Sequence, residues 1–121
     1  LLKIKSIRSI DAYLESILYN LIYNGIKYKR DGVQSTVDIQ TYIERRRKVI
    51  KVIDNGVGID VDKYSSKIFG LYQRFHDHVN GKGIGLYLVK TQVEALNGKI
   101  TISSKVNKGT VFKLSFPERS K

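Results

Sequence analysis

The order of helical and extended segments is the feature that most constrains the fold of this chain. Two amphipathic segments, at 11–29 and 84–96, carry apolar residues at the spacing of one helix face. Each is followed by two short extended segments joined by a turn, which predicts two antiparallel hairpins. This order argues against a doubly wound parallel sheet, and we expect an α+β fold: a two-layer sandwich with helices on one face of a mainly antiparallel mixed sheet. The predicted strands are 37–43, 49–53, 99–105 and 109–116.

The helix predicted at 11–29 carries two neighbouring stripes of side chains, with Asp11 near its N-cap. The apolar stripe, which should face the core, consists of Leu14, Ile17, Leu18, Leu21, Ile22 and Gly25. The polar stripe consists of Asn20, Asn24 and Lys27, with Tyr28 between the two. Two carboxamides one turn apart can direct oxygens at a hard cation such as Mg²⁺, which needs few protein ligands when phosphates supply others. A polar helix face with solvated amides is the alternative.

The stretch HVNGKGIGLYLVK, at 78–90, places three glycines before the second helix. Their spacing fits neither the P-loop nor the dinucleotide fingerprint. Glycine-rich turns that open a helix still bind anions, because their backbone N–H groups are unobstructed and the helix dipole is positive there. Gly81, Gly83 and Gly85 are therefore candidate phosphate ligands, with a flexible glycine loop as the alternative. The helix itself should turn inward Leu88, Val89, Val93 and Leu96 and end at Asn97-Gly98.

A third motif, Asp54-x-Gly56-x-Gly58, follows directly after an apolar strand. A carboxylate at a strand end can accept a hydrogen bond from an exocyclic amine such as adenine N6. The two glycines would let the backbone approach a flat base closely. An ordinary Asp-Asn-Gly turn is the alternative for this motif in isolation.

Composition sets the outer limits of function. The formal charge of +11 attracts polyanions such as nucleic acid, an anionic membrane or nucleotide phosphates, although a solvated basic surface explains the 45–48 run equally simply. Cysteine is absent, which excludes disulfides and thiolate metal sites and is compatible with a reducing cytosol. No apolar run reaches the ~20 residues of a membrane span. We expect one domain over 1–121 that begins within a pattern, as a fragment of a longer protein would.

Taken together and in this order, the motifs resemble one known family. The asparagine-containing helix, DNGVGID, IFGLYQRFH, GKGIGLYLVK and the final KGT are similar to the ATP-binding catalytic domain of bacterial sensor histidine kinases, particularly those of the Bacteroidetes kind. That domain belongs to the GHKL superfamily shared with gyrase, the ATP-dependent heat-shock chaperone and mismatch-repair ATPases. The resemblance runs from about Ile10 to Phe116 and implies the Bergerat fold with ATP and Mg²⁺ as cofactors.

The resemblance also implies roles for individual residues. Asn24 would be the Mg²⁺ ligand with Asn20 supporting it, and Lys27 would contact phosphate. The remaining nucleotide-binding residues implied by the family motifs are Tyr28 against adenine or ribose, Asp54 on adenine N6, Gly56, Gly58 and Ile59 around the base, Phe69 and Phe75 anchoring a lid, Gly81, Lys82, Gly83, Ile84, Gly85 and Leu86 around the phosphates, and Thr110 reaching the base through a water.

Asn20 bears on the type of reaction. Hydrolytic relatives carry a Glu at this position as the base that activates water, and an amide cannot accept that proton at neutral pH. The resemblance therefore favours phosphoryl transfer to a histidine, catalysed by positioning and by charge neutralisation. Gly25 stands where the family commonly has Ala, and His76 and His78 are expected to be surface or lid residues rather than phosphoacceptors.

The phosphoacceptor histidine would lie on an upstream dimerisation domain that is absent from this chain. The resemblance further implies a response regulator receiver domain as downstream partner, a homodimeric full-length protein and a cytoplasmic location for this domain. Three alternatives remain: a nucleotide-binding pseudokinase module, an anti-sigma-type serine kinase, which the IFGLYQRFH box disfavours, and a basic nucleic-acid-binding module. The last would need aromatic residues interleaved on a basic face, whereas the tyrosines here fall mostly on predicted helices.

Overall fold

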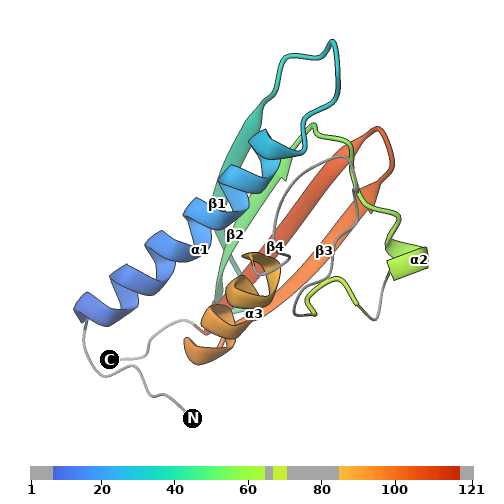
Figure 1. The fold of residues 1–121 in the computed structure, drawn as a ribbon. Coiled ribbons are helices and arrows are strands. Elements are labelled where there is room, and N and C mark those ends of the chain that lie inside the picture. The colour runs from blue at the N-terminus through green and yellow to red at the C-terminus, as the bar shows by residue number, and fades with distance from the viewer. Residues whose placement is uncertain (1–6, 65–66, 71–84, 118–121) are drawn as a thin grey trace.

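A computed structural model describes residues 7–64, 67–70 and 85–117 of the chain (Figure 1). It contains one four-stranded antiparallel sheet with helices on one face, which confirms the predicted two-layer α+β architecture. The elements, in chain order, are α1 (Ile7–Lys27), β1 (Val37–Glu44), β2 (Arg47–Asp54), α2 (Val61–Tyr64), α3 (Gly85–Ala95), β3 (Lys99–Lys105) and β4 (Gly109–Pro117). None of the helices in the described part of the chain has the length and apolar character to span a bilayer.

The strand order of the sheet is β1-β2-β4-β3, and every neighbouring pair is antiparallel. The second hairpin therefore inserts β4 beside β2, so that β2 and β4 form the centre of the sheet. Their register places Asp54 opposite Thr110, and Thr110 opposite Ser104 on β3. Because directly opposed side chains share a face, these three residues form one row at one end of the sheet.

The core lies between the sheet and the pair α1 and α3, which lie side by side (Figure 1). On α1 the predicted apolar stripe is confirmed, since Ile17 and Leu21 are completely buried. The other fully or almost fully buried members of the core are Val52, Val89, Val93, Phe112 and Leu114. Along β4 the buried residues Thr110, Phe112 and Leu114 alternate as the sequence pattern predicts, whereas in the apolar run of β2 the buried residues are Val49 and Val52.

The ends of the two long helices differ in how well they were predicted. Helix α1 begins at Ile7, so Asp11 is an exposed residue within the helix and its assignment near the N-cap is wrong. Residues 7–10 contain no glycine or proline, so the sequence does not prevent the helix from beginning before Asp11. Helix α3 ends as predicted: Asn97 takes a left-handed φ of 62°, and the Gly98 N–H donates to the Val93 carbonyl at 2.9 Å, as in a Schellman motif.

The predicted inward direction of Leu88 on α3 is also wrong, since its side chain is 37% exposed. Val89 and Val93, one turn apart, fill the contact with the core instead. Leu88 lies about 100° around the helix from Val89, and in a two-layer fold the sheet covers only one side of a helix. Leu96 packs partly buried against the core, as expected.

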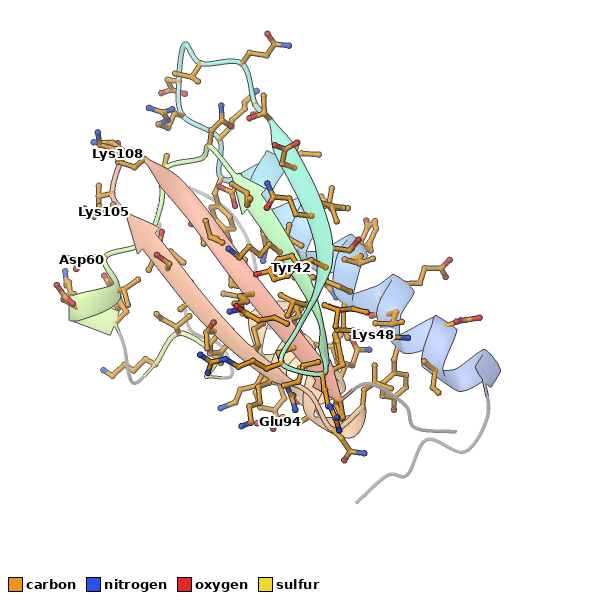
Figure 2. The ribbon with its side chains drawn as sticks, turned by 180° about the vertical axis from the view of Figure 1, so that it is seen from behind. Tyr42, Lys48, Asp60, Glu94, Lys105 and Lys108 are labelled. Atoms are coloured by element: carbon orange, nitrogen blue, oxygen red, sulfur yellow. The ribbon has the colours of Figure 1, made fainter. Side chains whose placement is uncertain are left out.

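The outer face of the sheet carries polar and basic side chains, and both long helices lie on its other side (Figure 2). Neighbours on the same face contact several of these cations. The Lys113 ammonium lies 3.1 Å from the Glu44 carboxylate, and the Lys51 ammonium lies 5.7 Å from the centre of the Tyr42 ring. Exposed pairs of this kind contribute little to stability.

Candidate functional site

The predicted asparagine pair on α1 lies opposite the first residue of α3. A Cβ atom at Gly85 would lie 3.8 Å from Asn24 Nδ2 and 3.9 Å from both Asn24 Oδ1 and Asn20 Oδ1. The Asn20 amide donates from Nδ2 to the Ser16 carbonyl at 3.0 Å, which leaves its Oδ1 on the side of Gly85. The folded chain therefore brings two amide oxygens to the N-terminal end of a helix, where the free backbone N–H groups and the dipole attract an anion.

The next residue of α1 reaches the second predicted motif. A Cβ at Gly25 would lie 3.0 Å from the Asp54 Cβ and 2.9 Å from a methyl group of Val37. The glycine thus allows α1 to approach the ends of β1 and β2 closely. Because Asn24 and Gly25 are consecutive, one turn of α1 lies close both to Gly85 at the start of α3 and to Asp54 at the end of β2.

Asp54 terminates β2 and is partly buried. Its Oδ1 accepts a hydrogen bond from the Gly56 N–H at 2.9 Å, which is the geometry of a turn. Burial removes water from the charged form and raises the pKa of Asp54 above its usual value of 3.8, against the lowering effect of backbone hydrogen bonds from Gly56 and Thr110. A carboxyl with a perturbed pKa beside converging polar groups is typical of a ligand site more than of a solvated turn.

The two glycines of this motif have structural neighbours that the sequence did not reveal. A Cβ at Gly56 would lie 2.6 Å from the Tyr28 carbonyl oxygen, and that carbonyl also accepts the Val57 N–H at 2.8 Å. Gly58 has a φ of 74°, and its Cβ would lie 2.0 Å from the Lys105 carbonyl oxygen. Close backbone packing therefore requires glycine at both positions, whatever else the motif binds.

Replacing Gly58 with alanine should destabilise the domain by about 3 kcal/mol or more, because the methyl group meets backbone and the residue keeps a left-handed φ. Gly32→Ala is the matched control, since Gly32 has nearly the same φ of 75° but no atom within 4 Å of its Cβ position. The control should lose only about 1 kcal/mol, the cost of the left-handed conformation. Chemical denaturation of both variants measures the difference, and equal losses would show that the contact with Lys105 costs nothing.

Lys27 is the last residue of α1, and Tyr28 follows it directly. The Lys27 ammonium lies 5.3 Å from the centre of the Tyr28 ring and 5.8 Å from that of Tyr23. It therefore stands at the C-terminal end of α1 on the same polar stripe as the two asparagines. A cation there adds positive charge on the side where the glycine at the start of α3 would hold an anion.

Ser104 was missed by the sequence interpretation. Its hydroxyl oxygen lies 2.8 Å from Thr110 Oγ1, 2.9 Å from the Gly109 carbonyl oxygen and 2.8 Å from the Ile59 backbone nitrogen. It thus links the loop after the DNGVG motif to the start of β4. The inward alternation Ile100, Ile102, Ser104 along β3 is the signal that could have indicated a polar residue on the site face.

The other predicted site residues divide into two groups. Phe69 and Leu86 pack partly buried against the core, and the Lys90 ammonium lies 5.9 Å from the centre of the Phe69 ring. The rest lie outside the described residues: Phe75, Gly81, Lys82, Gly83 and Ile84, together with His76 and His78. Within the described residues there is no group of three or more histidines, cysteines or acidic residues that could hold a metal ion.

Comparison with protein families gives a match over residues 10–120 to the model described as Histidine kinase-, DNA gyrase B-, and HSP90-like ATPase. The methanogenesis regulatory histidine kinase FilI of Methanothrix harundinacea is 33% identical over 86% of this chain and 12% of its own length. The sensor protein RprX of Bacteroides fragilis is 30% identical over 88% of this chain and 21% of its own length. The chain thus spans less than a quarter of either relative.

Solved structures share the fold. The mycobacterial sensor histidine kinase MprB superposes with a TM-score of 0.77 at 21% identity, covering 91% of this chain and 75% of that one. Full-length ShkA in complex with AMPPNP superposes with a TM-score of 0.73 at 23% identity, covering 90% of this chain and 22% of that one. The two-layer architecture is therefore that of a known domain type.

Proposed function

We propose, from the premise that this chain belongs to the family of histidine kinase-, DNA gyrase B- and HSP90-like ATPases, that it is the ATP-binding catalytic part of a sensor histidine kinase. The observation that carries the proposal is the approach of Asn20 and Asn24 to Gly85, at 3.8 to 3.9 Å from its Cβ position. It supplies an anion-binding helix end and oxygen ligands for a cation within one site. ATP with its metal is the ligand class that needs both.

The base and the phosphates would occupy opposite ends of this site. The base would lie at Asp54, which accepts a hydrogen bond from the adenine N6 amine. The phosphates would lie at the start of α3, with Lys27 contributing positive charge. Full-length ShkA, which shares the fold, was solved in complex with AMPPNP, and this supports a nucleotide as the class of ligand.

The asparagine side chains fit a Mg²⁺ ion, because amide oxygens are ligands that this metal accepts and phosphate oxygens would complete its shell. Asn24 would hold the ion, with Asn20 beside it. When bound, the ion would neutralise charge on the phosphates. The role of the chain is to hold the two oxygens at the helix end, and the Ser16 carbonyl assists by fixing the amide of Asn20.

Transfer is favoured over hydrolysis in this site. Hydrolysis requires a base that takes a proton from water, and the amide of Asn20 cannot serve as one at neutral pH. A neutral histidine needs no such base, since its ring nitrogen already offers a lone pair to phosphorus. The nitrogen–phosphorus bond would form as the bond from the γ-phosphorus to the bridging oxygen breaks, and ADP would leave.

The partners of the reaction follow from the same proposal. The acceptor histidine would be supplied by a dimerisation domain of the parent protein, and a receiver domain would take the phosphoryl group next. The domain would work in the cytoplasm, where ATP is available. FilI, named as a histidine kinase, and RprX, named as a sensor protein, support the kinase part of this proposal.

The test is to incubate the chain with γ-labelled ATP, alone and with the phosphoacceptor domain of its parent protein. We expect nucleotide binding, no label on the chain alone and label on the added domain. Stoichiometric labelling of His76 or His78 would contradict the proposed direction of transfer. Binding without any transfer would instead identify a regulatory nucleotide-binding module, and failure to bind ATP would reject the proposal.

A further inference from the structure

The hydroxyl group of Ser104 has three polar neighbours, and each imposes a condition on it. The Ile59 backbone N–H, at 2.8 Å, can only donate. The Gly109 carbonyl oxygen, at 2.9 Å, can only accept. The hydroxyl of Thr110, at 2.8 Å, can do either.

Only one arrangement of hydrogens satisfies all three contacts. A serine hydroxyl has one hydrogen and two lone pairs. Its hydrogen must point to Gly109, because that carbonyl has no hydrogen to give, and one lone pair accepts the N–H of Ile59. The second lone pair must then accept the hydrogen of Thr110. The hydroxyl of Thr110 is thereby committed as a donor to Ser104, and only its own lone pairs remain for any other partner.

The direction of the Thr110 hydroxyl matters because of the position of Thr110 in the sheet. It is 5% exposed and directly opposite Asp54 in the ladder between β2 and β4, so both side chains share the site face. A carboxylate also offers only lone pairs. The end of the site beside β4 therefore presents two acceptors and no hydroxyl donor, which suits a ligand group that carries two N–H hydrogens, directly or through a water.

We propose that Ser104 is a positioning residue for base selectivity: it holds the hydroxyl of Thr110 as an acceptor and so makes the site select an exocyclic amine over a carbonyl. The proposal rests on the proposed function, since it assumes that a nucleotide base lies at Asp54. It adds a residue on β3 that does not itself contact the base. Adenine presents an amine at the position where guanine presents a carbonyl oxygen, so the two nucleotides report the effect directly.

The experiment compares ADP and GDP affinities for the whole chain and for Ser104→Ala, each with Mg²⁺. Without the serine, the Thr110 hydroxyl rotates freely and can donate to the guanine carbonyl. We expect the ratio of ADP to GDP affinity to fall by roughly three- to tenfold, the worth of one hydrogen bond. Ser103→Ala is the matched control, because Ser103 is the preceding residue of β3 and is exposed on the outer face. The control should keep the ratio, and Ser104→Thr, which restores a hydroxyl, should recover it.

A merely structural role for Ser104 would weaken both nucleotides equally and leave the ratio unchanged, which would overturn the proposal. Thr110→Val provides a second measurement that does not depend on the folding of Ser104→Ala. Removal of the hydroxyl should itself lower the ratio, and an unchanged ratio in this variant would also overturn the proposal. In the Thr110→Val background, Ser104→Ala should change the ratio no further. If the unmodified chain binds neither nucleotide, the proposed function is rejected. If the unmodified chain prefers ADP and the Ser104→Ala variant prefers ADP to the same degree, only the role of Ser104 is rejected.

Discussion

Replacing Asn24 with alanine should strongly weaken Mg²⁺-dependent nucleotide binding and leave the domain folded. The amide is one of the two on α1 that face Gly85, with its Oδ1 and Nδ2 within 3.9 Å of the Cβ position there. Loss of a metal-site side chain should weaken Mg·ATP binding on the order of 100-fold. The residue is off the apolar stripe, and alanine is a strong helix former, so the melting temperature of the free domain should change little.

Glu15→Ala is the control for Asn24→Ala. Glu15 is exposed on the same helix, nine positions earlier, which at about 100° per residue places it on the opposite side. Isothermal titration with Mg·ATP, and again with ATP and a chelator, measures the metal-dependent part of binding. Unchanged affinity for Mg·ATP in Asn24→Ala would reject this residue as a metal ligand.

Asp54 should make the domain distinguish adenine from guanine nucleotides. An ionised carboxylate accepts hydrogen bonds only, so adenine N6 satisfies it and guanine O6 opposes it with a second acceptor. An unpaired polar group in a partly buried site costs roughly 1–3 kcal/mol. ADP with Mg²⁺ should therefore raise the melting temperature in a concentration-dependent way, and GDP should raise it far less.

Two substitutions distinguish the effect of the Asp54 charge from the effect of its side-chain shape. Asp54→Ala removes the acceptor and should nearly eliminate the shift with ADP. Asp54→Asn retains one acceptor and adds a donor, so it should bind ADP better than the alanine variant and show a narrower preference over GDP. Melting shifts of the three proteins with both nucleotides provide the measurement. Equal shifts for ADP and GDP in the unmodified domain would mean that Asp54 is a turn residue only.

Because the pKa of Asp54 is raised, the binding of ADP should also depend on pH. Because burial raises this pKa above 3.8, the carboxyl stabilises the free domain most fully below 3.8, and that contribution is lost as the pH rises through the raised value. At neutral pH the free domain therefore holds a destabilised carboxylate, to which a bound amine donates a hydrogen bond. ADP binding should weaken as the pH falls through the raised pKa, at a higher pH than an ordinary Asp would require, and Asp54→Asn should lack this dependence.

Local patterns were reliable wherever a residue's own neighbours along the chain determine its environment. The apolar stripe around Ile17 and Leu21 and the stop at Asn97-Gly98 follow from helical periodicity and from the left-handed φ that Asn and Gly tolerate. The start of α1 was less predictable, because a helix continues upstream until something stops it, and a polar residue such as Asp11 is compatible with both a cap and a helix interior. The prediction that Leu88 points inward was wrong for a related reason. Periodicity gives the width of an apolar stripe but not which edge of that stripe the sheet covers.

The order of the two long helices and the four strands, the two-layer class and the candidate site residues Asn20, Asn24 and Asp54 could be predicted from sequence patterns, whereas α2 and the role of Ser104 could not. The folded structure was needed to show that Asn24 lies close to Gly85, that Gly58 packs on the Lys105 carbonyl and that Ser104 lies beside the Thr110 hydroxyl. Of these pairs, Asn24 and Gly85 are sixty-one positions apart and Gly58 and Lys105 forty-seven. Such contacts depend on which strands become neighbours and in what register, and on how closely a helix can approach them. Side-chain periods of 3.6 and 2 residues describe one element at a time and contain no information on those distances.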